Sequence, residues 1–319
     1  MKVNWWIGIC IVLCGCQMNL PNTPSHVTPR CDIPVHRTSA TAWSYGEEGY
    51  LFGGRDEKGQ IHRDLWKYNP QQDTWSSLGN TPLNSRVNGC ACCVDDKVYV
   101  GLGFRNSIYQ DSSYLSDWWE YTPSSNNWKR LADFPNLNTV GVIPYKDGNK
   151  IYCIHGFGTD FTADIICFDI ETESWTIIER ANRKDRIAMA GAGVSLHGRH
   201  FYGTGYNTHS LDCWYEIQWD AEWITKARVP SRREMAVCVS TDQYIYLVGG
   251  RYFGGSLTDG KLYDDMLRYD IHTNQWTQAG VTNETGENRF AFTINGVAFV
   301  GGGENDSHGV LNTFYRIED

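Results

Sequence analysis

The chain has 319 residues, of which 41% are hydrophobic and 13% aromatic. This composition is sufficient to bury a large core, and no long segment has the low hydrophobicity that is typical of a disordered chain. The formal net charge of −9 argues against a general nucleic-acid or membrane-surface binder, because both partners are polyanions that attract a basic protein.

The first residues have the features of an export signal. Lys2 gives a positive start, residues 5–13 form an apolar run, and the run closes with LCGC at residues 13–16. A membrane-spanning helix needs about 20 apolar residues, so this shorter run predicts a secretory signal peptide. The LCGC segment resembles the lipobox of bacterial lipoproteins, which implies cleavage before Cys16 and lipidation of Cys16. An ordinary signal peptide with a chance cysteine is the alternative.

The residues after Cys16 bear on location. Gln17 follows the cysteine in place of an aspartate, and residues 17–24 contain no acidic run. In lipoproteins this pattern implies the bacterial outer membrane and its periplasmic face. We therefore divide the start of the chain into a signal peptide, residues 1–15, and a lipidated cysteine with its tether, residues 16–25.

An apolar and aromatic strand that ends in glycine recurs six times along the rest of the chain. In five of the six copies an aromatic residue follows, and then a tryptophan seven or eight residues later. The successive tryptophans at 75, 128, 175, 223 and 276 are 53, 47, 48 and 53 residues apart. A period of about 50 residues is typical of kelch repeats. The strand copies are GYLFGG, VYVGLG, IYCIHGFG, FYGTG, IYLVGG and AFVGGG.

Each repeat predicts four short antiparallel strands. Such a sheet has two apolar faces and cannot bury both alone, so copies pack face to face around an axis. The aromatic rings then fill the gaps between sheets. Across residues 36–319 the chain resembles the kelch β-propeller family, which implies an all-β, six-bladed ring. The predicted propeller domain is residues 26–319.

The ends of the chain predict how the ring closes. The last repeat stops after its third strand, TFYRIED, and lacks a tryptophan strand. Trp75 and Trp175 each lie 11 residues before an arginine that opens the next inner strand, and the same count back from Arg37 reaches His26. We expect the segment around His26 to supply the missing outer strand of the sixth blade.

Arginines recur where the inner strands are predicted to begin and after the glycine turns. Blade three has Asn138 or Thr139 at the first of these places. In kelch proteins that bind ligands, arginines at matching strand starts line the pocket, so the resemblance implies a basic channel mouth that suits an acidic ligand. The alternative is that these side chains only hydrogen-bond neighbouring loops. The strand-start arginines are Arg37, Arg86, Arg186, Arg233 and Arg289, and those after the turns are Arg55, Arg105 and Arg251.

Two loops between second and third strands are long. They belong to blades two and five, which face each other across a six-bladed ring, and both carry aromatic residues. Exposed aromatics and arginines are common binding hot spots, so these loops predict a cleft; drift in tolerant surface loops is the alternative. The aromatic residues are Tyr109 and Tyr114 in one loop, and Tyr252, Phe253 and Tyr263 in the other.

Catalytic and metal motifs are not found in the sequence. It contains no G-x-S-x-G, H-E-x-x-H or P-loop lysine, and no cysteine pairs at zinc-finger spacing. We predict no cofactor and no metal. Most of the eight cysteines after Cys16 lie in apolar runs, where a buried thiol is favoured over a disulfide. Glu234, Glu287 and Glu304 are expected near the mouth, either as ion-pair partners of arginine or as an acid or base.

The function that the sequence favours is binding. We expect an exported lipoprotein that docks a protein or an anionic glycan on its loop face, contacts the membrane only through its lipid, and does not bind nucleic acid. The alternative is an enzyme: exported six-bladed kelch proteins include the N-acetylneuraminate epimerases, or mutarotases. That resemblance implies an arginine for the substrate carboxylate and a carboxylate or histidine for proton transfer, and these residues are not matched one by one.

Overall fold

The computed structural model describes residues 27–105, 113–135, 139–154, 157–158, 165–178, 188–254 and 260–319. Regular structure there is almost entirely β, with a short 3₁₀ turn, η2, at Pro123–Ser125. Within these residues no helix is long and apolar enough to cross a membrane. Five predicted positions lie outside the described residues: Cys16, His26, Tyr109, Asn138 and Arg186.

Six four-stranded antiparallel sheets form the blades. From the innermost strand outward, blade one is β2 (Thr41–Tyr45), β3 (Glu48–Phe52), β4 (Asp64–Asn69) and β5 (Thr74–Asn80), and blade two is β6 (Cys90–Val94), β7 (Lys97–Gly101), β8 (Trp118–Thr122) and β9 (Asn127–Arg130). Blade three is β11 (Ile143–Asp147), β12 (Lys150–Ile154), β14 (Ile165–Asp169) and β15 (Ser174–Ile178), and blade four is β16 (Ala192–Leu196), β17 (Arg199–Gly203), β18 (Trp214–Glu216) and β19 (Ile224–Thr225). Blade five is β20 (Val237–Ser240), β21 (Ile245–Val248), β24 (Asp265–Asp270) and β25 (Gln275–Val281), and blade six is β26 (Phe290–Ile294), β27 (Val297–Gly301), β30 (Phe314–Ile317) and β1 (Val27–Pro29).

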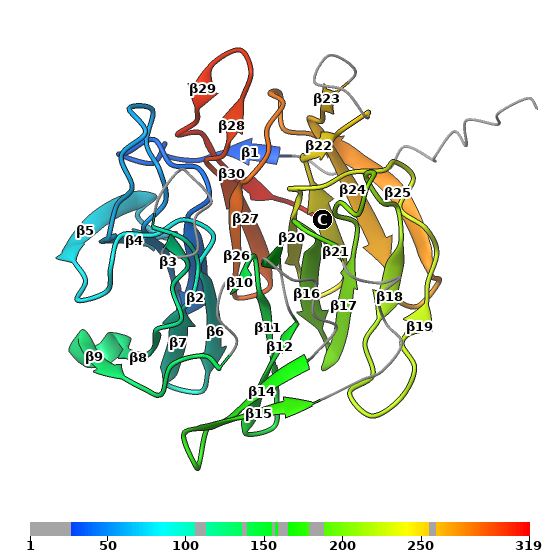
Figure 1. Cartoon of the computed structure of the whole chain (residues 1–319). Coiled ribbons are helices and arrows are strands. Elements are labelled where there is room, and N and C mark those ends of the chain that lie inside the picture. Colours follow the sequence, from blue (N-terminus) through cyan, green and yellow to red (C-terminus); the bar gives the residue numbers. More distant parts are fainter. Residues whose placement is uncertain are drawn as a thin grey trace, which may run out of the picture.

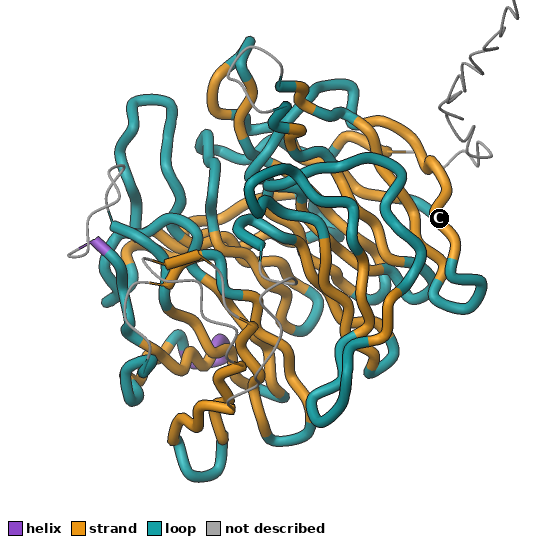
Figure 2. Tube along the Cα trace, turned by 45° about the vertical axis from the view of Figure 1, so that its right-hand side comes forward, coloured by secondary structure: helices purple, strands orange, loops and turns teal. Residues whose placement is uncertain are grey.

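The blades close into a ring. Each innermost strand contacts those of the two neighbouring blades, in the order β26, β2, β6, β11, β16, β20 and back to β26. Figure 1 shows the six sheets around this axis, and in Figure 2 their strands run side by side with loops at their ends. The predicted six-bladed propeller is confirmed. Three small ribbons extend from the loops: β10 (Thr139–Val140) with β13 (Phe157–Gly158), β22 (Arg251–Tyr252) with β23 (Lys261–Leu262), and β28 (Glu304–Asn305) with β29 (Gly309–Val310).

The recurring aromatic and tryptophan stand opposite each other on the two outer strands. In the first blade Tyr68 pairs with Trp75 across β4 and β5, and their ring centroids are 5.0 Å apart. The Tyr68 hydroxyl also donates to the carboxylate of Asp73, a residue with φ of 53° in the intervening hairpin. The same contact recurs with Asn126 in blade two and Asn274 in blade five. The seven-residue spacing is therefore a property of this hairpin.

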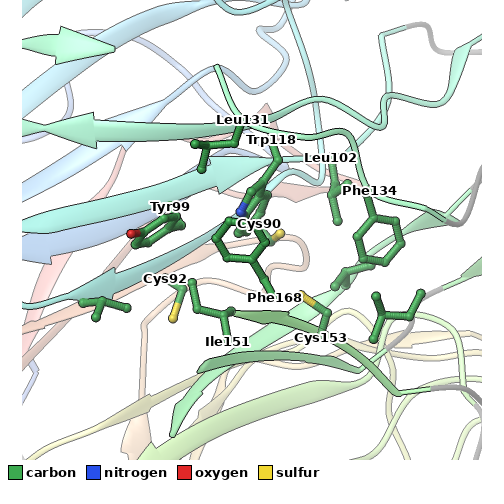
Figure 3. Packing of buried hydrophobic residues seen from close by; sticks show 13 residues of the cluster. Cys90, Cys92, Tyr99, Leu102, Trp118, Leu131, Phe134, Ile151, Cys153 and Phe168 are labelled. Carbon is green, nitrogen blue, oxygen red and sulfur yellow. The ribbon is translucent and has the colours of Figure 1, made fainter. Parts of the chain in front are cut away.

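The rings pack against the next blade, as Figure 3 shows between blades two and three, where Tyr99, Trp118 and Phe168 meet. Trp118 and Phe168 are fully buried, with centroids 6.2 Å apart. Cys90 and Cys153 fill the space between these rings as buried thiols, and burial raises the pKa of Cys90 to about 12. All eight cysteines in the described ranges are free.

The N-terminal segment completes the last blade. Val27 pairs with Ile317 and Pro29 with Tyr315, so β1 is the outer strand beside β30 (Figure 1). The chain then continues along blade six, where the Ile33 amide donates to the Asn312 carbonyl at 2.9 Å. The predicted closure by an N-terminal strand is confirmed, and it begins at the residue after His26.

Replacing Ile33 by Ala should weaken this closure. Its side chain is 1% exposed and packs with residues of blades one and six, so the cavity should cost about 2–5 kcal/mol of unfolding free energy. Urea denaturation measures this loss. Ile177→Ala is the matched control, because Ile177 lies on an outer strand and is 48% exposed. Equal losses in the two variants would contradict the role of the N-terminal segment.

Candidate functional site

One end of the ring is built from six backbone pairs. In each blade the residue just past the second-strand turn forms an antiparallel bridge with the residue three positions before the innermost strand. We call these residues the mouth. They are Thr38 with Arg55, Val87 with Phe104, Val140 with Phe157, Met189 with Tyr206, Glu234 with Arg251, and Glu287 with Glu304.

The recurring glycines make these bridges possible. Gly250 has φ of 93°, and a Cβ atom there would lie 2.7 Å from the Glu234 carbonyl oxygen. Gly54 occupies the same place in blade one, with φ of 85° and a distance of 2.9 Å to the Thr38 carbonyl. Glycine alone combines this backbone conformation with such a close approach. The glycine turns therefore serve the fold rather than cradle an anion.

Three of the predicted arginines lie buried directly beneath the mouth. Arg37, Arg86 and Arg233 each stand four residues before an innermost strand and are 3%, 0% and 0% exposed. Each donates to a backbone carbonyl of the glycine turn and to an aspartate that precedes or begins the third strand. The Arg86 guanidinium, for example, holds Asp117 through two bonds of 3.0 and 2.7 Å. Asp64 and Asp265 are the partners of Arg37 and Arg233.

These buried arginines join three strands of one blade. Their guanidinium groups are neutralised inside the protein. The sequence left two roles open for these arginines, lining a ligand pocket or hydrogen-bonding neighbouring loops, and their geometry favours the second. The strand-start position is not an arginine in every blade: Thr139 occupies it in blade three and Ala188 in blade four. The structure therefore differs from our alignment of Arg186, which precedes Ala188 by two residues.

The guanidinium group of Arg289 reaches the glycine turn of blade six, as the other three reach theirs, but from a different backbone position. It stands three residues after the strand-start position of blade six, which Gly286 occupies. A Cβ atom on Gly286 would lie 2.7 Å from the Arg289 guanidinium, so the glycine leaves room for it. Arg289 donates to the Gly302 carbonyl at 3.0 Å. Its carboxylate neighbour is Glu284, at 4.0 Å.

The arginines after the glycine turns lie at the mouth itself. Arg55 binds Glu304 at 2.5 Å, and Arg251 binds Glu287 at 2.7 Å and Asp306 at 2.9 Å. Glu287 and Asp306 raise the pKa of Arg251. Arg105, at the start of the blade-two loop, is exposed. The described mouth differs from the basic one expected, because Glu234, Glu287, Glu304 and Asp306 outnumber the guanidinium groups between them.

Glu234 is the unusual group in this set. It is 4% exposed, and its Oε2 atom has no hydrogen-bond partner within the described part of the chain. Burial raises the pKa of Glu234, and the nearby Glu287 raises it further. Glu234 can therefore hold a proton, and donate it, at a pH where an exposed glutamate is ionised. The sequence signal for Glu234 is its position directly after the buried Arg233.

The other half of the mouth is apolar. Val87, Phe104 and Val140 form a buried cluster with Ile61 and Tyr114, and the rings of Phe104 and Tyr114 are 5.1 Å apart. The mouth positions are therefore divided. Those of blades two to four hold apolar residues, which form a buried cluster in blades two and three, and those of blades five, six and one include the ion-paired residues.

The blade-five loop leans across onto blade four. The Phe253 ring lies 5.9 Å from that of Tyr206, and the Phe253 amide donates to the Ser210 hydroxyl at 2.9 Å. Tyr252 and Phe253 are half-buried. Tyr263 turns inward instead, with its ring 4.2 Å from the buried Arg233 guanidinium. The sequence predicted that Tyr252, Phe253 and Tyr263 act together as aromatics of one loop. In the structure Phe253 contacts blade four, whereas the Tyr263 ring packs on Arg233.

Nothing in the described ranges suggests a metal site, since no three His, Cys, Asp or Glu residues gather to hold an ion.

Comparisons with known proteins agree with the fold. The KLHDC2/KLHL20/DRC7 Kelch-repeats domain matches residues 17–139, and the Kelch motif matches residues 232–280. A solved structure entitled "Structure of YjhT" has a TM-score of 0.72 at 16% identity, and the match covers 90% of this chain and 99% of that one. The chain has the kelch-type six-bladed β-propeller fold.

Curated relatives match parts of this kelch propeller. Kelch-like protein 25 of Xenopus tropicalis is 21% identical over 76% of this chain and 41% of the relative. Kelch domain-containing protein 3 of Homo sapiens is 39% identical over 35% and 30%. N-acetylneuraminate epimerase of Pasteurella multocida is 31% identical over 26% and 22%. The chain thus spans less than half the length of these relatives.

Replacing Arg86 by Met should destabilise the propeller strongly. The change leaves the carboxylate of Asp117 without its partner in a buried site, which should cost about 3–5 kcal/mol of unfolding free energy in urea denaturation. Arg130→Met is the control: its ion pair with Asp133 is 57% and 48% exposed, so its loss should cost less than about 1 kcal/mol. A small loss in the Arg86 variant would show that the arginine is not a structural tie.

Replacing Glu234 by Gln should change how stability depends on pH. Because the folded state raises the pKa of Glu234 above 4.5, ionising this group opposes folding as pH rises through the folded-state pKa. The glutamine variant resembles the neutral acid at every pH. We expect its unfolding free energy, relative to the unmodified protein, to increase between pH 4.5 and neutral pH. Glu57→Gln, on an exposed turn, is the control and should show no such trend.

Proposed function

We propose that this kelch propeller is an exported binding module whose partner docks on the mouth and its flanking loops. The observation that carries the proposal is the division of the mouth into an apolar half and an ion-paired half. A surface with aromatic anchors beside arginine and carboxylates offers both the apolar area and the directional bonds that recognition needs.

The partner class that fits this mouth best is a protein segment. Even without Glu234, the carboxylates of Glu287, Glu304 and Asp306 outnumber the guanidinium groups of Arg55 and Arg251 that they pair with, so a polyanionic glycan would meet like charge there. A protein segment can place apolar side chains on the half-buried rings of Tyr206 and Phe253 while polar groups meet Arg251 and Glu304.

The proposed location is the bacterial outer membrane, on its periplasmic face. Support comes from the apolar run at residues 5–13 and the LCGC segment, which resembles a lipobox. Lipidation at Cys16 would then hold the propeller at the membrane through the lipid alone.

The enzymatic alternative is an N-acetylneuraminate epimerase. The local likeness to the Pasteurella multocida enzyme and the proton-holding carboxyl of Glu234 favour it, since anomer exchange needs a group that donates and accepts a proton. NMR of sialic acid anomers tests this alternative: acceleration by the protein that disappears in Glu234→Gln, with a melting temperature no lower than that of the unmodified protein, would replace binding by catalysis as the function.

Removing the aromatic anchors should abolish partner capture. We expect the double change Tyr206→Ala and Phe253→Ala to lose the specific partner in a pull-down from outer-membrane extract, because truncating a central anchor commonly costs 2 kcal/mol or more, which is about 30-fold in affinity. The double change Ile177→Ala and Ile224→Ala, on exposed outer strands, is the control and should keep the partner. An identical set of captured proteins in both variants would overturn the proposed docking face.

A further inference from the structure

A small cavity lies at the seam between the last blade and the first, at the end of the ring opposite the mouth. Its volume is about 150 Å³. The β26–β27 and β4–β5 hairpins and the segment after β1 surround it. We call it the seam cavity; its lining residues are Arg30, Pro70, Gln71, Ile294, Asn295, Val297, Phe299 and Arg316.

The charged residues of this lining are two arginines and no carboxylate. Arg30 follows β1, and Arg316 lies on β30, so pairing of these two strands brings both guanidinium groups to one cavity. The uncharged amides of Gln71 and Asn295 complete the polar part of the lining.

Arg30 is held in place and keeps free donors. Its Nε atom donates to the Tyr68 hydroxyl at 3.1 Å, and one terminal nitrogen donates to the Pro70 carbonyl at 3.0 Å. Its Nε atom also lies 3.2 Å from the carboxylate of Asp73, which accepts hydrogen bonds from the Tyr68 hydroxyl and the Cys31 amide as well. A guanidinium group has five N–H donors, so the bonds described for Arg30 leave others for a ligand.

Arg316 is less fully engaged. Its nearest carboxylate is Glu318, at 3.6 Å from Nε, and Glu318 accepts a hydrogen bond from Thr28 at 3.0 Å. The Nε atom is buried and has no hydrogen-bond partner within the described residues. Asp73 and Glu318, the carboxylates paired with these arginines, are not part of the cavity lining, so the lining itself offers guanidinium donors and no carboxylate.

The apolar part of the lining limits the kind of anion. Pro70, Ile294, Val297 and Phe299 form the rest of the wall. A water molecule takes up about 30 Å³ in the liquid, so the cavity has room for an oxyanion group with a short apolar body.

We propose that the seam cavity binds a small oxyanion, a carboxylate or a phosphate, carried on a short apolar group. Arg30 and Arg316 hold the oxyanion through charge-assisted hydrogen bonds, with Gln71 and Asn295 beside them. Because the cavity joins blade six, the N-terminal segment and blade one, the bound anion also strengthens ring closure. This site is separate from the mouth, and it does not depend on the proposed function.

Calorimetric titration of the purified protein with sodium butyrate and with sodium phosphate tests the site. We expect butyrate to bind with a dissociation constant on the order of 1 mM, and more weakly by about tenfold or more in Arg316→Gln. The melting temperature should rise with butyrate in the unmodified protein and not in the variant. Arg130→Gln, on an exposed pair in blade two, controls for the lost charge and should bind normally.

A second variant keeps the test independent of folding at β30. Gln71→Glu changes an exposed residue, whose amide donates to Glu47 at 3.3 Å, to an isosteric acid. It should abolish butyrate binding through like charge, and its melting temperature without ligand shows whether the ring remains folded. Vesicles of phosphatidylcholine with phosphatidylglycerol distinguish a lipid headgroup from a free anion. Vesicle binding that is lost in both Arg316→Gln and Gln71→Glu would identify a lipid as the source of the bound oxyanion. No binding of any probe, or equal binding in all four proteins, would overturn the proposal.

Discussion

Closure of the ring is the constraint on which the rest of this structure depends. Each blade has two apolar faces, and these are buried only when every sheet packs between two neighbours. The sixth sheet obtains its outer strand from the other end of the chain, through the pairing of β1 with β30. Ile33, Tyr68 and Phe314, which come from distant parts of the sequence, then share one core cluster. The mouth and the seam cavity both exist only in the closed ring.

The buried arginines show how a repeated position can serve the fold, here in three of the six blades, and leave function to its neighbour. Arg37, Arg86 and Arg233 are used up by backbone carbonyls and aspartates beneath the mouth. The next residue along the chain forms the bridge that faces the channel end, and there the blades differ most: threonine, valine, methionine and glutamate all occur. The buried arginine contacts fix the backbone at this place. The bridge residue is therefore free to vary between blades, and one half of the mouth is apolar while the other half is charged.

The sequence was sufficient to predict the ring, because the glycine turns and the tryptophans repeat in every complete copy and depend only on local geometry. It could not predict which arginines are buried. The aspartates that neutralise Arg37, Arg86 and Arg233 follow them by 27, 31 and 32 residues, across a loop whose length varies, so no fixed spacing connects the partners. Arg289 shows a second difficulty, since its side chain reaches the common place from a shifted position that only Gly286 permits.

The two ends of the propeller would face different surroundings if Cys16 carries a lipid. Only ten residues lie between Cys16 and the start of β1 at Val27, and the 11 Cα–Cα steps that join them span at most about 40 Å when fully extended. Val27 pairs with Ile317, at the end of β30 remote from the mouth. A tether attached there would turn the seam cavity, with Arg30 and Arg316, toward the membrane and the mouth away from it. The mouth would then be open to a protein partner, while the arginines of the seam cavity would lie near the lipid headgroups.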